Sequence, residues 1–358
     1  MMDSHTPILI AGPCSAESRD QVLTTAEGLV SSSIDYFRAG IWKPRTQPGA
    51  FEGVGSTGLP WLTEVKSSFG LKVCTEVANA RHVEEALKAE IDLLWVGART
   101  TTNPFQVQEI ADSLKGVEVP VAIKNPTHPD LALWLGAFER MDLAGISNLM
   151  AIHRGFAVHG QKKYRNAPLW QIPIDFRNRL PQIPLLNDPS HICGKRELLS
   201  EVSQMAMDLA FDGLMVETHP APDEAWTDAA QQLTPQAFAE LISGMVMRSS
   251  GAEIEADDLF SMRAEINMVD EALIELFARR MGLSEKIGHY KKAHGLTILQ
   301  NTRWNELLKR NQDLGLEQGI DPGFTSDVFK SIHQASIAIQ KRIMQEGAEN
   351  EEATPKGT

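Results

Sequence analysis

The sequence predicts an α/β fold, a closed (β/α)8 or TIM barrel, followed by an all-α helical domain. Up to about residue 247, short apolar runs rich in branched residues alternate with amphipathic stretches. Eight strand–helix units are typical of a closed parallel barrel, with a doubly wound open sheet as the alternative. The expected strands are Ile8–Gly12, Tyr36–Ala39, Lys72–Thr75, Leu93–Gly97, Pro120–Lys124, Ser147–Ile152, Ile183–Asn187 and Leu214–Glu217.

The pattern changes after Arg248, where Ser249-Ser250-Gly251 forms a small, polar break typical of a linker. Apolar residues then recur at helical spacing and predict a helix from Asp257 to about Lys292. A second helix is expected from Thr302 to Leu314, and a third from Asp321-Pro322. The predicted domains are therefore a barrel (1–247), a linker (248–256), a helical domain (257–346) and an acidic disordered tail (347–358).

Composition excludes several classes of protein. The net charge of −13 argues against a general nucleic-acid binder. No apolar run reaches the roughly 18–20 residues that span a bilayer, and the first ten residues do not resemble a signal peptide. Three widely spaced cysteines argue against a disulfide scaffold. We expect a cytoplasmic protein without nucleic-acid or membrane partners.

Cationic side chains follow several predicted strands, at the end of the barrel where active sites lie. Each one alone is expected to be a solvated loop charge. Together they favour substrates with phosphate and carboxylate groups, which arginine binds through paired hydrogen bonds. The cationic set comprises Arg38, Lys43, Arg45, Arg99, Lys124 and Arg154.

A second set at the strand ends offers one thiol, one imidazole and two carboxyl groups: Cys14, His191, Glu217 and Asp228. This mixture of soft and hard ligands suits a divalent transition metal such as Mn²⁺, or Fe, Co or Zn. Spacing alone leaves open a buried core cysteine and a structural histidine.

Six motifs in the first 247 residues resemble the 3-deoxy-D-arabino-heptulosonate 7-phosphate (DAHP) synthases. They are Ala11-Gly12-Pro13-Cys14-Ser15, Lys43-Pro44-Arg45-Thr46, Gly97-Ala98-Arg99, Ile123-Lys124-Asn125, Asp188-Pro189-Ser190-His191 and Val216-Glu217-Thr218-His219-Pro220. The resemblance implies that Cys14, His191, Glu217 and Asp228 bind the metal. It implies that Arg38, Lys43, Arg99, Lys124 and Arg154 bind phosphoenolpyruvate, and that Arg45 and Thr46 face erythrose 4-phosphate.

The resemblance also implies a reaction, the entry step of the shikimate pathway of aromatic amino acid biosynthesis. The metal polarises the aldehyde of erythrose 4-phosphate, the methylene carbon of phosphoenolpyruvate attacks it, water adds and phosphate leaves. Lys43 is expected to donate a proton to the developing alkoxide. The alternative is a 3-deoxy-octulosonate 8-phosphate synthase, which uses a five-carbon sugar phosphate. Pro44-Arg45-Thr46 after Lys43 favours the four-carbon substrate.

Six polar residues of the helical domain are otherwise expected to be surface groups: Arg263, Arg280, Lys291, Arg303, Ser336 and Gln340. However, Asp257–Met344 resembles the all-helical chorismate mutases, and these residues match that family's positions. The resemblance implies a homodimer in which Arg263 enters the partner's site. It implies that arginines bind the two carboxylates of chorismate while Lys291 and Gln340 bond its ether oxygen, with Ser336 also binding substrate.

Two positions depart from the mutase pattern. Gln300 stands where an acid often contacts the substrate hydroxyl, and it retains hydrogen-bonding ability. Trp304 replaces a glutamate and supplies no acceptor. We therefore consider three hypotheses: a bifunctional enzyme, transferase and isomerase; a helical domain that mainly senses chorismate or prephenate; and a combination in which prephenate inhibits the barrel allosterically.

Overall fold

The structure, a computed structural model, describes residues 6–44, 49–160, 162–248 and 257–345. The chain divides into two compact units between Ser250 and Gly251. Arg45 and Thr46 lie outside the described residues, as do the predicted tail and all of the predicted linker except Arg248.

Eight parallel strands form a closed barrel in sequence order, with β1 paired to β8. The closed barrel is confirmed, and the open-sheet alternative is wrong. Most predicted strand boundaries move by one or two residues, because apolar runs do not mark where ladder hydrogen bonds begin. The strands are β1 (Ile8–Gly12), β2 (Tyr36–Arg38), β3 (Val73–Val77), β4 (Leu93–Val96), β5 (Val121–Lys124), β6 (Leu149–His153), β7 (Leu185–Asn187) and β8 (Gly213–Glu217).

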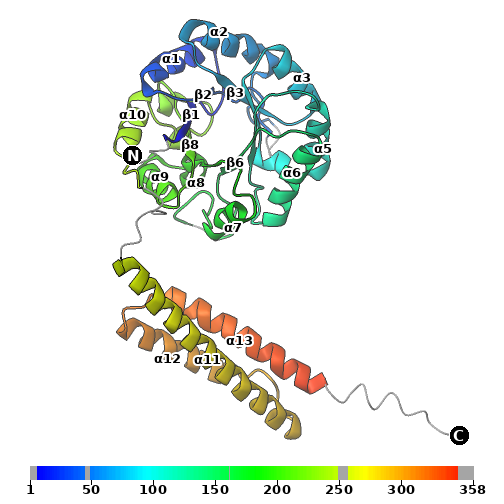
Figure 1. The fold of residues 1–358 in the computed structure, drawn as a ribbon, viewed down its shortest axis with the longest axis vertical. Helices are drawn as coiled ribbons and strands as arrows, with labels where there is room; N and C mark the ends of the chain where they lie inside the picture. Colours follow the sequence, from blue (N-terminus) through cyan, green and yellow to red (C-terminus); the bar gives the residue numbers. More distant parts are fainter. Residues whose placement is uncertain (1–5, 45–48, 161, 249–256, 346–358) are drawn as a thin grey trace, which may run out of the picture. The chain divides into compact units, whose positions relative to one another are not determined.

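Helices surround the strands in a ring (Figure 1). Several begin at a side-chain cap, as where Asn79 accepts a hydrogen bond from the backbone N–H of His82. The helices are α1 (Arg19–Leu29), α2 (Leu59–Phe69), α3 (Ala80–Lys88), α4 (Ala98–Thr101), α5 (Pro104–Ser113), α6 (Leu131–Leu143), α7 (Gln171–Arg179), α8 (Pro189–Cys193), α9 (Leu199–Asp208) and α10 (Pro235–Ser243).

The barrel has two apolar layers. One fills the interior and includes Ile10, Trp95 and Met215; the other lies between strands and helices and includes Phe37 and Trp134. All five side chains are buried. Because both faces of every strand are covered, the strands are mainly apolar rather than alternating, as is typical of parallel sheets.

Three helices form the second unit: α11 (Asp257–Ala293), α12 (Asn301–Glu317) and α13 (Pro322–Gln345). The three-helix prediction is confirmed, although α12 extends beyond Leu314. Asp321 caps α13 by accepting a 2.8 Å hydrogen bond from the backbone of Phe324. Helix α13 packs against both α11 and α12. None of the helices in the described ranges is long and apolar enough to cross a membrane.

The closure of the barrel depends on Gly213, which pairs with Ile8 where β8 meets β1. A Cβ atom at Gly213 would lie 2.0 Å from the backbone oxygen of Ile8. We predict that Gly213→Ala lowers the free energy of unfolding by about 1–3 kcal/mol, because the backbone must move apart. Chemical unfolding followed by barrel tryptophan fluorescence measures the change.

Gly136, in the middle of α6, is the matched control because a Cβ there meets nothing within 4 Å. Gly136→Ala should stabilise the barrel by roughly 0.5–1 kcal/mol through helix propensity. Equal effects of the two substitutions would show that the contact between Gly213 and Ile8 does not limit closure.

Candidate active site

A cluster of potential metal ligands lies at the carboxyl ends of the strands. Cys14 follows β1, Glu217 ends β8, and Asp228 lies in the loop after β8. One ligand atom from each of these residues lies within 4.8 Å of the others. The Cys14 Sγ is 3.2 Å from Asp228 Oδ2. The structure thus brings together three of the four predicted metal ligands in one group.

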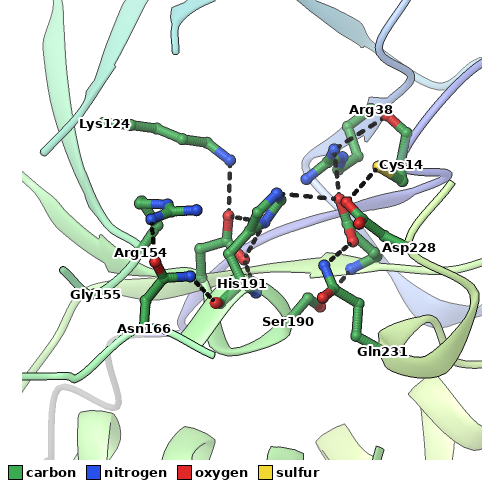
Figure 2. Close-up of polar contacts among 12 residues, drawn as sticks. Cys14, Arg38, Lys124, Arg154, Gly155, Asn166, Ser190, His191, Asp228 and Gln231 are labelled. Carbon is green, nitrogen blue, oxygen red and sulfur yellow. Dashed lines mark hydrogen bonds and ion pairs between the residues drawn. The ribbon is translucent and has the colours of Figure 1, made fainter. Parts of the chain in front are cut away.

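His191, the fourth predicted ligand, lies in α8 directly after β7, and its ring faces the cluster (Figure 2). Its Nε2 is 3.7 Å from Glu217 Oε1. Its Nδ1 is 2.8 Å from Asp188 Oδ2, so Asp188 orients the ring and leaves Nε2 directed toward Glu217. Asp188 is in turn bound by Lys124 at 2.7 Å.

Two neighbouring glutamines hold the cluster together. Gln232 accepts a 3.0 Å hydrogen bond from the backbone N–H of Cys14 and donates a 2.8 Å bond to the carbonyl of Thr227. Gln231 donates a 2.6 Å hydrogen bond to Glu217 Oε2. Asp228 adopts a left-handed conformation with φ of 54°, which aspartate tolerates better than most residues. The loop after β8 is therefore tied to both β1 and β8.

The donor chemistry of the cluster fits a metal site. Burial, with the nearby Glu217, raises the pKa of the Cys14 thiol to about 12, so metal binding must displace its proton. Burial alone would raise the pKa of Glu217, but the charges of His191 and Arg38 outweigh burial and hold it below its usual value. A thiolate, an imidazole and two carboxylates form a donor set that suits a transition-metal ion.

Three of the predicted cationic residues are nearly buried beside this cluster: Arg38, Lys124 and Arg154. Arg38 donates a 3.1 Å hydrogen bond to Glu217, while its Nε and Nη1 have no hydrogen-bond partner among the described residues. Trp95 lies inside the barrel, with the Arg38 guanidinium 5.0 Å and the Lys124 ammonium 5.8 Å from its ring centroid. Trp95 therefore supports two cations by cation–π contacts.

A pocket joins the cations to the cluster. Lys43, whose Nζ lies 3.1 Å from the Cys14 Sγ, shares its lining with Arg99, Lys124, Arg154 and His191. Four of the six predicted cationic residues thus line one pocket. Arg38 is not among its lining residues, and Arg45 lies outside the described residues. Glu76, directly after the predicted strand Lys72–Thr75, lies within β3 and also lines the pocket.

Arg165 is a residue of this site that strand-end reasoning missed. It donates a 2.8 Å hydrogen bond to Asp228 and a 2.7 Å bond to Gln231. It also lines the pocket. Because Arg165 lies well beyond the end of β6, only its charge could have drawn attention to it. Trp95, Gln231 and Gln232 carried no charge signal at all.

A second polar group lies in the helical unit. Arg280 donates a 2.8 Å hydrogen bond to Ser336 Oγ, which also lies 3.1 Å from Ser284 Oγ. Lys291 donates to the carbonyl of Ile298 at 2.5 Å. Gln340 is buried, and its Oε1 has no partner within the described part of the chain.

The other predicted polar residues of the helical unit are exposed rather than buried with this group. Arg263 and Gln300 are exposed, and the exposed Arg303 lies 3.8 Å from Glu306. Trp304, the next residue, stacks face to face on His333 with ring centroids 3.9 Å apart.

Comparison with known proteins relates both units to characterised families. The DAHP synthetase I family matches residues 3–249, and the chorismate mutase type II family matches residues 262–341. A phospho-2-dehydro-3-deoxyheptonate aldolase of Thermotoga maritima is 30% identical over 66% of this chain and 68% of the relative. A 2-dehydro-3-deoxyphosphooctonate aldolase of Wolinella succinogenes is 26% identical over 68% of this chain and 99% of the relative.

Solved structures agree with the sequence comparisons. A crystal structure of the Thermotoga maritima DAHP synthase superposes with a TM-score of 0.61 at 29% identity, covering 67% of this chain and 68% of that one. A truncated form of DAHP synthase from the same organism gives a TM-score of 0.57 at 26% identity, covering 67% of this chain and 85% of that one.

The barrel has a cationic pocket beside a cluster of metal-type ligands. Together with the family match, this places it in the class of enzymes that join phosphoenolpyruvate to a sugar phosphate. Within this class, the chain belongs to the DAHP synthetase I family and carries a chorismate mutase type II domain after the barrel. The chain thus combines a transferase and an isomerase of the shikimate pathway. The octulosonate alternative has weaker support, because the relatives of that activity share less identity.

The bridging role of Gln232 is testable without substrate. Gln232→Leu keeps the side-chain volume but leaves the backbone N–H of Cys14 and the carbonyl of Thr227 without their present partners. Each orphaned group costs about 1–3 kcal/mol, so we predict that the free energy of unfolding falls by at least about 2 kcal/mol. Gln236→Leu, at an exposed position of α10, should change it by less than about 0.5 kcal/mol. Similar values for the two variants would contradict the bridge.

Proposed function

We propose that the barrel makes DAHP from phosphoenolpyruvate and erythrose 4-phosphate with a divalent metal bound by Cys14, His191, Glu217 and Asp228. We further propose that the helical domain rearranges chorismate to prephenate and mediates inhibition of the barrel by prephenate. The observation that carries the first proposal is the approach of Cys14, Glu217 and Asp228 within 4.8 Å, beside a cationic pocket. The domain boundaries and a cytoplasmic location remain as predicted from the sequence.

The cationic residues account for binding of two anionic substrates. Arg38 is buried, and its Nε and Nη1 have no hydrogen-bond partner within the described ranges, so a carboxylate or phosphate of phosphoenolpyruvate would satisfy them. Lys124, Arg154 and Arg99 extend the same positive surface. Holding both substrates in one orientation converts a bimolecular reaction into an effectively unimolecular one. Arg45 and Thr46 are proposed to bind erythrose 4-phosphate on the strength of their motif.

Lys43 is proposed as the proton donor to the developing alkoxide. Burial alone would lower the pKa of Lys43, but the neighbouring Cys14, Glu76 and Glu217 outweigh burial and raise it, so the amine carries its proton at neutral pH. Its Nζ lies 3.1 Å from the Cys14 Sγ, so Lys43 would hold its proton beside the residues proposed to bind the metal. The metal, Mn²⁺ or a similar ion, would supply Lewis-acid polarisation of that aldehyde.

Metal dependence is tested by stripping the protein with chelator and adding back Mn²⁺. We predict that chelator abolishes condensation and that Mn²⁺ restores it. Cys14→Ala and His191→Ala should each lower metal affinity by at least about 100-fold, because each removes a proposed ligand. Metal content by mass spectrometry and condensation rates with erythrose 4-phosphate or a five-carbon sugar phosphate are the measurements.

Cys193→Ala is the control, since Cys193 lies two residues from His191 but packs in the core between strands and helices. It should retain metal and activity. Full activity in chelator without bound metal would contradict the metal assignment, and preference for the five-carbon sugar would favour the octulosonate alternative.

The polar group of the helical domain supports binding of a dianion. Arg280 and Lys291 supply two positive charges, and Ser336 and the buried Gln340 supply neutral hydrogen bonds. Helix α11 also leaves a row of apolar side chains exposed: Met262, Ile266, Val269, Leu273 and Leu276. An apolar surface of this kind is typical of a protein interface. It supports the proposed homodimer, in which the exposed Arg263 would complete the partner's site.

Feedback gives a physical reason for joining the two domains, because a ligand of the helical domain can bias the activity of the barrel. Such coupling is typically about 1–3 kcal/mol. We predict that prephenate inhibits condensation by the full chain and that Arg280→Ala removes this inhibition while preserving the uninhibited condensation rate. Initial rates over a prephenate titration measure both quantities.

An Arg280→Ala protein that remains equally sensitive would show that prephenate acts at the barrel. Inhibition without measurable rearrangement of chorismate in the wild-type protein would favour the helical domain as a sensor with little catalysis.

A further inference from the structure

Trp304 and His333 form a stacked pair in the helical domain. Their rings lie 3.9 Å apart with an interplanar angle of 11°. Trp304 is in the first turn of α12, directly after Arg303. His333 lies on α13, three residues before Ser336 and seven before Gln340, so the three share one face of that helix. The pair therefore adjoins the polar group of Arg280 and Ser336.

His333 has an unused hydrogen-bonding atom. Its Nε2 is buried and has no partner among the residues in the described ranges. A buried polar atom without a partner carries a desolvation cost that a suitably placed ligand would remove. Burial, together with the charges of Arg280 and Lys291, lowers the pKa of His333, so the imidazole is neutral at neutral pH. His333 is thus a neutral polar group among cations.

The ring hydroxyl of chorismate is the group that such a residue could bind, because Gln300, which the sequence places opposite this hydroxyl, is exposed in the structure. Arg280 and Lys291 are suited to its carboxylates and ether oxygen, but its ring hydroxyl needs a neutral donor or acceptor. Trp304 has only a ring N–H donor. A neutral imidazole nitrogen either accepts from a hydroxyl or donates to it, depending on the tautomer.

We infer that His333 Nε2 hydrogen-bonds the ring hydroxyl of chorismate, and that Trp304 is a positioning residue that holds the imidazole by stacking. This assignment makes His333 a specificity-determining residue that replaces the acceptor missing at Trp304. It rests on the proposed function, namely that the site around Arg280 binds chorismate.

The test compares His333→Leu, which removes the polar nitrogen, with His333→Gln, which keeps a hydrogen-bonding group. The full-length variants are assayed for rearrangement of chorismate. A chorismate analogue with hydrogen in place of the ring hydroxyl is measured as a competing ligand. His333→Leu should lower kcat/KM for chorismate at least about 10-fold and leave the affinity for the analogue unchanged. His333→Gln should recover most of kcat/KM.

Trp304 variants separate positioning from binding. Trp304→Phe keeps an aromatic face and should stay near the wild-type kcat/KM, whereas Trp304→Leu should lower it for chorismate but not weaken binding of the analogue. The condensation rate and helical circular dichroism report whether each variant is folded.

Equal losses for chorismate and the analogue in folded His333→Leu would overturn the inference, because they would indicate a general structural role. Unchanged kinetics of His333→Leu in an active enzyme would also overturn it. A wild-type protein that neither binds nor rearranges chorismate would instead overturn the proposed function on which the inference rests.

Discussion

Glu217 carries a carboxylate at a position with no exposed surface, and the mouth of the barrel is built around that group. Arg38 and Gln231 bind its two oxygens, and Ser190 accepts a hydrogen bond from its backbone N–H. A buried carboxylate without such partners would cost several kcal/mol. The loop after β8 is therefore held by Glu217 through Gln231, and that loop carries Asp228 to Cys14.

The two units use charge in different ways. In the barrel, charged and polar groups pair over short distances, as in the contacts from Lys124 through Asp188 to His191. Such pairing fixes the orientation of each side chain before a substrate arrives, which is the basis of electrostatic preorganisation. In the helical unit, Arg280 and Lys291 are bound by neutral groups, so their positive charge remains available to a dianion.

Strand-end position predicted Cys14, His191 and Glu217, because the parallel topology brings every strand end to one mouth. Arg165 was not predicted, because it lies in the irregular segment between β6 and α7, and only the folded structure shows its contact with Asp228. Gln231 and Gln232 were not predicted, because an uncharged amide does not indicate a site residue in a sequence until its hydrogen-bond partners are known. In the helical domain, periodicity predicted three helices, but only the three-dimensional contact between α12 and α13 pairs Trp304 with His333. The precise strand limits depend on ladder hydrogen bonds, which composition does not specify.

We propose that one divalent metal is bound beside the cationic pocket by Cys14, His191, Glu217 and Asp228. A crystal structure of the full chain grown with Mn²⁺ and phosphoenolpyruvate, with anomalous scattering collected for manganese, tests it most directly. We predict one manganese peak per barrel, bonded to all four side chains, with phosphoenolpyruvate against Arg38. A manganese peak elsewhere, or an occupied substrate pocket in catalytically active crystals that contain no metal, would contradict it.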